Sequence, residues 1–338
     1  MNIIIPMAGM GKRMRPHTLT TPKPLIPIAG KPIVQRLVEE IISTCNEKVE
    51  EIAFIIHPSF GKEAEEHLVN VAASMGAKGK ICYQEQPLGT AHAMLCASDT
   101  LKGNVFVAFA DTLFKATFNI DTNKDAIVWT QKMEDPSSFG VVKLNASSEI
   151  EAFVEKPKDF VSDLAIIGVY YFKDGENLKK ELQRLLDNDI KIKGEYQITD
   201  AMDHMLKQGL KFYTDQVDEW LDCGNKDATV YTNGRVLEHK QHKEQLVAAS
   251  AKVENSSIKA PCFIGEGVVI KDSVIGPYVS IETGAQIEGC YISNSIIREE
   301  SIVKNARLQN SLLGKNVTYI ENKQDIKDVS LGDFSTLL

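Results

Sequence analysis

The chain lacks several features that mark special classes of protein. Its 338 residues carry a net charge of −8, which disfavours non-specific binding to nucleic acid or to anionic membranes. It has no apolar run near the roughly 20 residues that span a bilayer, and no basic stretch leads into an apolar core at its start. Its six cysteines are scattered without a CxxC pair, which argues against a disulfide or zinc framework. These absences predict a soluble cytoplasmic protein that binds neither nucleic acid nor membrane.

What remains is an ordinary globular composition over a length that suits two domains. Hydrophobic residues make up 43% of the chain and charged residues 25%. Because the chain as a whole is acidic, any phosphate ligand needs a local basic cluster or a bridging metal ion.

From residue 2 to about residue 223, short apolar runs alternate with amphipathic stretches. Residues 52–56 and 105–109 are too short for helices and rich in β-branched or aromatic side chains, so they read as buried strands. Residues 33–42 place their apolar side chains on one face of a helix. This alternation predicts an α/β fold with a Rossmann-like, mixed, mostly parallel sheet flanked by helices. Ligands of such sheets bind beyond the carboxyl ends of the strands.

The pattern changes after residue 224. A helical stretch that runs into the polar residues 239–244 reads as a linker, and then aliphatic residues recur every five or six positions. They are Ile258, Ile264, Ile270, Ile275, Ile281, Ile287, Ile292, Ile297, Val303, Leu308 and Leu313. This period is typical of hexapeptide repeats that coil into a left-handed parallel β-helix, and an antiparallel meander is the weaker alternative. We therefore predict a catalytic domain over 1–224, a linker helix over 225–250, a β-helix over 251–320 and a tail over 321–338.

A glycine-rich loop follows the first predicted strand. Glycines at such a place let backbone N–H groups approach a polyphosphate, and Arg13 and Lys23 can supply fixed positive charge to it. A Walker A loop has four residues between its glycines, whereas Met10 alone separates them here. A dinucleotide-binding GxGxxG motif is also excluded, because Met14 occupies the third glycine position and prolines 16, 22 and 24 would break the helix that must follow.

Residues 9–16 (GMGKRMRP) and 22–25 (PKPL) resemble the signature of the sugar-nucleotide pyrophosphorylase family of nucleotidyltransferases. Its members include glucose-1-phosphate thymidylyltransferases and mannose-1-phosphate guanylyltransferases. The resemblance implies that Arg13 and Lys23 are catalytic and act on the triphosphate and the leaving pyrophosphate. The loop at 85–93 matches the segment that reads the nucleobase in this family. The nucleotide-binding residues implied are Ala8, Gly9, Gly11, Gln86, Gly89 and Thr90.

Further motifs follow in the order that the family shows. Asp111 and Asp222 each end a predicted strand, and the resemblance makes them the ligands of Mg²⁺, although Ala110 replaces the usual preceding glycine. In the motif at 154–157 (VEKP), the resemblance implies that Glu155 accepts hydrogen bonds from sugar hydroxyls and that Lys156 pairs with the sugar phosphate. It also implies that Gly140 allows the backbone to approach the sugar closely. The resemblance covers roughly residues 2–224.

The resemblance implies transfer of a nucleotidyl group from a nucleoside triphosphate to a sugar-1-phosphate, with release of pyrophosphate and with Mg²⁺ as cofactor. Residues 165–172 (AIIGVYYF) lack the asparagine of many members but look like the thymidylyltransferase branch. This favours dTTP or UTP, with GTP and mannose-1-phosphate as the alternative. A non-catalytic regulatory subunit is a further alternative. An acyltransferase role for the β-helix is disfavoured, because no histidine follows His242. We expect a homo-oligomer.

Overall fold

The computed structural model describes residues 1–117, 119–321 and 325–338. The chain forms two compact units, of which the first comprises Met1–Gly9 and Leu37–Trp220. The second comprises Met10–Arg36 and Leu221–Leu338. The glycine-rich loop, which we placed in a continuous catalytic domain, thus clusters with the C-terminal part of the chain. The boundaries at 224, 250 and 320 stay predictions.

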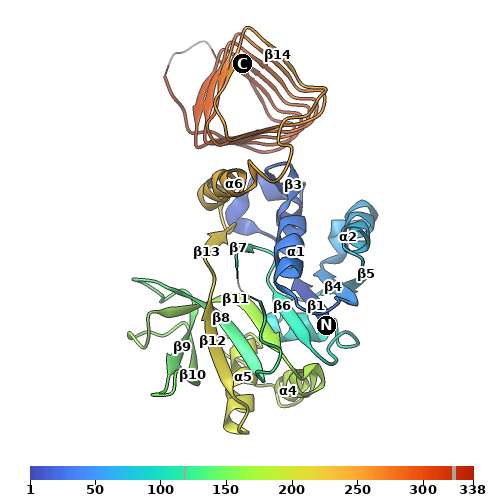
Figure 1. Cartoon of the computed structure of the whole chain (residues 1–338), viewed down its shortest axis with the longest axis vertical. Coiled ribbons are helices and arrows are strands. Elements are labelled where there is room, and N and C mark those ends of the chain that lie inside the picture. The colour runs from blue at the N-terminus through green and yellow to red at the C-terminus, as the bar shows by residue number, and fades with distance from the viewer. Residues whose placement is uncertain (118, 322–324) are drawn as a thin grey trace. The chain divides into compact units, whose positions relative to one another are not determined.

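The first unit is built on one nine-stranded mixed sheet (Figure 1). Its strands are β1 (Asn2–Pro6), β4 (Glu51–Ile56), β5 (Lys78–Tyr83), β6 (Val105–Ala108), β8 (Ala126–Lys132), β9 (Gly140–Leu144), β10 (Ile150–Glu155), β11 (Leu164–Phe172) and β12 (Phe212–Gln216). They run in the order β10-β9-β11-β6-β1-β4-β5, and β8 pairs with both β11 and β12. β1 is parallel to β4 and β6, and β4 to β5, whereas β11 is antiparallel to β6, β8 and β9.

The apolar runs of the sequence occupy the centre of this sheet. Ile3, Ile4 and Ile5 of β1 are fully buried, as expected of a strand whose two faces are both covered. The helices of the unit are α2 (Lys62–Ser74), α3 (Thr90–Leu95), α4 (Gly175–Asp187) and α5 (Ile198–Lys207), and α1 (Ile33–Thr44) crosses from one unit into the other. Side chains such as Leu182 of α4 and Met202 of α5 share one apolar core with the strands. The predicted α/β class is confirmed.

Within the second unit, short strands coil into a parallel β-helix, seen nearly end-on in Figure 1. The strands are β14 (Lys252–Glu254), β15 (Ser257–Ile258), β16 (Cys262–Ile264), β17 (Val269–Lys271), β18 (Val274–Ile275), β19 (Val279–Ile281), β20 (Gln286–Glu288), β21 (Tyr291–Ser293), β22 (Ser295–Ile297), β23 (Ile302–Lys304), β24 (Arg307–Gln309), β25 (Leu312–Leu313), β26 (Thr318–Ile320), β27 (Ser330–Leu331) and β28 (Thr336–Leu337). Three sheets form the three faces: β14-β17-β20-β23-β26-β28, β15-β18-β21-β24 and β16-β19-β22-β25-β27.

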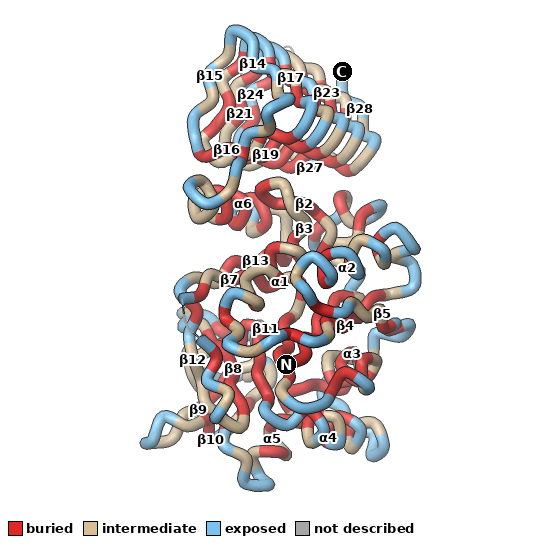
Figure 2. The backbone as a smooth tube through the Cα atoms, turned by 45° about the vertical axis from the view of Figure 1, so that its right-hand side comes forward, coloured by how far each residue is buried: buried red, intermediate tan, exposed pale blue. Residues whose placement is uncertain are grey.

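The repeat aliphatics stack in register from coil to coil. Ile264 lies opposite Ile281, Ile281 opposite Ile297, and Ile297 opposite Leu313. All four are fully buried, and Figure 2 shows buried residues along β19 but exposed residues along β14. Inward aliphatics at a six-residue period therefore build the core, as the sequence predicted.

Two features of the second unit lie outside the repeat. Helix α6 (Lys226–Lys240) precedes the β-helix, and Asn225 caps its first turn by accepting a hydrogen bond from the Ala228 N–H at 3.0 Å. The segment that we named as a tail contributes β27 and β28, which pair in parallel with β25 and β26. Within the described ranges, no helix has the length and apolar composition needed to cross a membrane.

Candidate functional site

The glycine-rich loop belongs to the second unit and contains no regular helix. It folds as three short 3-10 turns, at Lys12–Met14, His17–Leu19 and Lys23–Leu25, because its prolines interrupt any longer helix. Gly11 takes a φ of +57°, and its carbonyl accepts a hydrogen bond from Thr18 Oγ1 at 2.8 Å. A Cβ on Gly11 would lie 3.0 Å from Thr18 Cγ2 and 3.1 Å from Lys23 Cβ. The glycine therefore lets the loop close on itself with Lys23 packed against its start.

Arg13 and Asp222 face the same small residue of the second unit. Asp222 ends β13 (Glu219–Asp222), and its Oδ1 accepts a hydrogen bond from the Gly224 N–H at 3.0 Å. A Cβ on Gly224 would lie 2.9 Å from Arg13 Nη2 and 3.0 Å from Asp222 Oδ2. The structure thus brings a predicted catalytic cation together with a predicted metal ligand, and Gly224 provides the space for both.

The other predicted metal ligand, Asp111, belongs to the first unit. It is half-buried in the turn between β6 and β7 (Thr112–Lys115). The turn is held on both sides, because the Phe109 N–H donates to Gly168 O at 3.0 Å and Thr112 Oγ1 donates to Ile167 O at 2.9 Å. Gly168 takes a φ of +79° where β11 breaks register, and a Cβ there would lie 3.3 Å from the Phe109 ring. Gly168 therefore permits the close approach that fixes the Asp111 turn.

Ala8 and Gly9 directly follow the carboxyl end of β1. The Met7 N–H donates to Ile55 O at 2.8 Å, which continues the ladder with β4 up to this point. A Cβ on Gly9 would meet no atom of the described residues within 4 Å. The backbone here is therefore accessible at a strand end, where ligands of α/β sheets bind.

The predicted base-reading loop of the first unit is closed by the backbone of Tyr196. The Tyr196 N–H donates to Leu88 O at 2.9 Å, and Tyr196 O accepts from the Ala91 N–H at 3.0 Å. Gly89 takes a φ of +115°, and a Cβ on it would lie 2.7 Å from Tyr196 N. Gln86 is exposed at the tip of the loop. Only glycine fits at position 89, and the amide of Gln86 is available to a ligand.

Thr90 already has partners within the protein. Its hydroxyl lies 3.1 Å from Gln197 Oε1 and accepts a hydrogen bond from the Ile198 N–H at 3.0 Å. Ile198 begins α5, so Thr90 satisfies one of the N–H groups that a helix start leaves unpaired. A role in nucleotide binding stays a prediction for this residue.

Gln84 supports the base-reading loop, and the sequence analysis missed it. Its side chain is buried, and Nε2 lies 3.3 Å from Gly89 O and 3.1 Å from His92 Nδ1. Burial lowers the pKa of His92, so the ring is neutral near pH 7 and Nδ1 can accept from the amide. Gln84 directly follows β5, whose residues are mostly exposed or half-buried, so the buried strand that marked Asp111 is not there to signal it.

The predicted sugar-phosphate residues meet where β9 and β10 pair. Gly140 lies opposite Glu155, and a Cβ on Gly140 would lie 3.0 Å from Glu155 Oε2. Thr199 Oγ1 donates to the same carboxylate oxygen at 3.3 Å. Lys156 is exposed, and its Nζ lies 3.7 Å from Glu155 Oε1. An acceptor carboxylate and a cation are therefore adjacent, as binding of a hydroxylated anion requires.

Asp200 adds a second carboxyl group beside Glu155. Burial, followed by the charges of Glu155 and Asp203, raises the pKa of Asp200 to about 6. Its Oδ2 is buried and has no hydrogen-bond partner among the described residues. Gln197 is the N-cap of α5, so Thr199 and Asp200 both lie in the first turn of the helix.

The predicted Mg²⁺ ligands suit an ion that is held largely by substrate. The described residues contain no group of three or more His, Cys, Asp or Glu side chains that could hold a metal ion. Mg²⁺ commonly binds one or two carboxylates and completes its shell with substrate phosphates and water. Asp111 and Asp222 have the carboxylate chemistry that such a shell uses, and their role as Mg²⁺ ligands stays a prediction.

The chain is similar in sequence and fold to known proteins. The profile of the nucleotidyl transferase family matches residues 2–239. The chain is similar to glucose-1-phosphate thymidylyltransferase of Streptomyces antibioticus, with 29% identity over 94% of this chain and 93% of that protein. It is also similar to the low-salt glycan biosynthesis nucleotidyltransferase Agl11 of Haloferax volcanii, with 30% identity over 91% and 90% of the two chains. A solved UDP-glucose pyrophosphorylase complexed with UDP-glucose shares the fold, with a TM-score of 0.58 and 24% identity over 70% of this chain and 98% of that chain. The chain belongs to the nucleotidyl transferase family, as its opening motif indicated.

Proposed function

We propose that the protein joins a nucleoside triphosphate to a sugar-1-phosphate, forming a nucleoside diphosphate sugar and pyrophosphate. The observation that carries this proposal is the convergence of Arg13 and Asp222 on Gly224. A loop cation and a metal-ligand carboxylate at one point are what an acidic protein needs to bind a polyphosphate. The thymidylyltransferase from Streptomyces antibioticus, similar along nearly its whole length, supports dTTP and glucose-1-phosphate as substrates.

The reaction needs positioning and charge neutralisation rather than a general base. The phosphate oxygen of the sugar-1-phosphate is already anionic near neutral pH, and it attacks the α-phosphorus in line with the departing pyrophosphate. Arg13 and Lys23 stabilise the charge that develops on the pyrophosphate. Lys156 holds the attacking phosphate, and Glu155 accepts hydrogen bonds from sugar hydroxyls. Asp111 and Asp222 would hold Mg²⁺, which would supply further neutralisation of the phosphate charge.

The nucleobase and the sugar are tested together by pyrophosphate release. The purified chain is assayed with dTTP, UTP, GTP, ATP and CTP, each against glucose-1-phosphate, mannose-1-phosphate and N-acetylglucosamine-1-phosphate. We expect dTTP with glucose-1-phosphate to have the highest kcat/KM, and GTP with mannose-1-phosphate would support the guanylyltransferase alternative. If no pair releases pyrophosphate while nucleotide still binds, the regulatory-subunit alternative replaces the proposal.

A further inference from the structure

The C-terminal segment 328–333, for which the sequence predicted no function, contacts the glycine-rich loop within the second unit. The Asp333 carboxylate is buried, and its Oδ2 accepts hydrogen bonds from Thr20 Oγ1 at 2.6 Å and from Thr21 Oγ1 at 3.2 Å. Arg298, also buried, places its Nη1 at 3.3 Å from Asp333 Oδ1 and 3.2 Å from Thr21 Oγ1. A buried ion pair of the β-helix thus binds the loop between its two predicted catalytic cations.

Two more contacts fix the same stretch of the loop. The buried His17 places Nε2 at 2.9 Å from Ser330 Oγ. Burial and the charge of Arg298 lower the pKa of His17 to about 4, so the ring is neutral near pH 7. A Cβ on Gly332 would lie 3.0 Å from Pro16 Cβ, so the glycine permits close packing of the segment against the loop.

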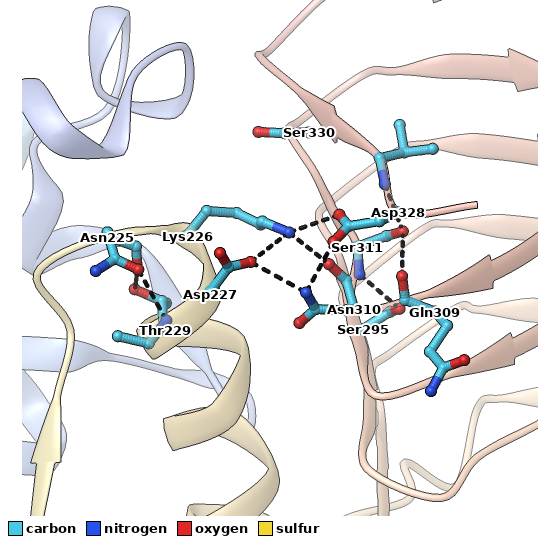
Figure 3. A network of polar contacts seen from close by, with 12 residues as sticks. Asn225, Lys226, Asp227, Thr229, Ser295, Gln309, Asn310, Ser311, Asp328 and Ser330 are labelled. Carbon is cyan, nitrogen blue, oxygen red and sulfur yellow. Dashed lines mark hydrogen bonds and ion pairs between the residues drawn. The ribbon is translucent and has the colours of Figure 1, made fainter.

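The other end of the segment binds the start of α6, as Figure 3 shows. Lys226 Nζ lies 2.6 Å from Asp328 Oδ1 and donates to Asn310 O at 2.8 Å. Asn310 Nδ2 in turn donates to Asp328 Oδ2 at 2.8 Å and to Asp227 Oδ1 at 3.0 Å. Lys226 and Asp227 form the first turn of α6, directly after the Asp222–Gly224 turn.

We propose that residues 328–333 are a positioning segment for catalysis, which holds the loop of Arg13 and Lys23 and the strand end of Asp222 in one arrangement. This inference rests on the proposed function, because that function gives the two elements a common substrate. Asp333 acts on the loop and Asp328 on the start of α6. Both are positioning residues, since in-line transfer depends on alignment of the groups around the phosphates. The β-helix would then contribute to the reaction through its last coil.

Hydrogen exchange tests the placement without any substrate. In full-length Asp333→Ala, we expect amides of residues 14–25 to exchange at least about tenfold faster than in the wild type, since local protection follows local contacts. In Asp328→Ala, the acceleration should appear at residues 226–231 instead. Asp272→Ala is the matched control, because Asp272 lies in the β-helix and accepts its hydrogen bond from Asn255. Unchanged exchange of the loop in Asp333→Ala would overturn the proposal.

Steady-state kinetics test the consequence for catalysis. We expect Asp333→Ala to raise KM for the nucleotide and to lower kcat, each about tenfold, as loss of a charged hydrogen-bond acceptor should. KM for the sugar-1-phosphate should stay within about twofold, since Gly140, Glu155 and Lys156 belong to the first unit. A purely structural role would lower the melting temperature without this split between the two KM values.

A milder pair of variants covers the case in which Asp333→Ala does not fold. Thr20 is exposed, so Thr20→Val removes one hydrogen bond to Asp333 with little change in shape, whereas Thr20→Ser keeps the hydroxyl. We expect Thr20→Val to raise the nucleotide KM and Thr20→Ser to restore it, and equal values for both would contradict the proposal. A wild type that releases no pyrophosphate would refute the proposed function, whereas the exchange experiment would still decide whether the segment positions the loop.

Discussion

At the scale of single residues, Arg13 is the side chain on which the proposed chemistry depends most. Its guanidinium faces Asp222 across Gly224, where it can stabilise charge on the leaving pyrophosphate. We expect Arg13→Ala to lower kcat by about two to four decades, as loss of transition-state charge stabilisation does. Arg15→Ala removes the same charge from the same exposed loop, and its kcat should stay within about threefold of the wild type. Near-normal turnover of Arg13→Ala would contradict the assignment.

Residues with a chemical signature were predictable, and residues that act through burial were not. Arg13 and Asp222 stand beside glycines after strands, a pattern that a sequence displays directly. Gln84 is buried although it follows a largely exposed strand, and Asp333 contacts residues distant in sequence, so no local pattern marks either residue. One motif and one glycine predicted the sugar-phosphate residues Gly140, Glu155 and Lys156. In the structure, the pairing of β9 with β10 brings these residues together.

At the scale of elements, the base-reading loop depends on the backbone conformation of Gly89. A side chain at position 89 would be strained by the positive φ and would also collide with the Tyr196 backbone. We expect Gly89→Ala to lower the free energy of unfolding by about 2–4 kcal/mol and to raise KM for the nucleotide. Gly61→Ala is matched in conformation, since Gly61 has a φ of +80° but no described atom within 4 Å of a Cβ. It should cost about 1 kcal/mol, as measured by urea unfolding of both variants.

The β-helix contains a carboxyl group whose titration should be visible in stability. Glu282 follows β19, is almost fully buried, and has its pKa raised to about 8 by burial and by the charge of Glu299. The folded state therefore retains a proton that the unfolded chain loses, so this contribution to stability falls as pH rises from about 4.5 to about 8. We expect Glu282→Gln to exceed the wild type in unfolding free energy at pH 8.5 and to match it near pH 4.5. The exposed Glu266→Gln should show no such divergence, and a wild type equal to Glu282→Gln at both pH values would contradict the assignment.

The repeat was predictable to the residue, but its last coil was not. Each repeat aliphatic from Ile264 to Leu313 is buried in the core of the β-helix, because steps of five or six residues return these positions to the inside of every coil. The segment after residue 325 pairs with β25 and β26, but it also contacts the glycine-rich loop through polar and charged side chains. A hydrophobic period cannot reveal these additional contacts, because they are made with hydroxyl groups, an imidazole and an arginine.

At the scale of the whole molecule, binding of the predicted Mg²⁺ should be visible in the thermal stability of the protein. A ligand that binds only the folded state raises the free energy of unfolding by RT ln(1 + [L]/Kd), where [L] is the free ligand concentration. We expect Mg²⁺ with dTTP to raise the melting temperature of the wild type, and Asp111→Asn or Asp222→Asn each to abolish most of that rise. Asp272→Asn is the control, and EDTA should remove both the rise and pyrophosphate release until Mg²⁺ is restored. An unchanged shift in both aspartate variants would refute the metal assignment.

The hydrogen bond between His17 and Ser330 joins positions 313 residues apart. During synthesis His17, in the loop with Arg13, leaves the ribosome 313 residues before Ser330, in the segment that holds this loop. Closing so long a loop is slow. Until it closes, the loop with Arg13 and Lys23 lacks its contacts with residues 328–333. We expect a ribosome-stalled chain that lacks residues after 325 to fold its mixed sheet yet to leave residues 14–25 open to protease. Activity would then appear only after residues 328–333 have been synthesised, so that a product terminated before them consumes no nucleotide.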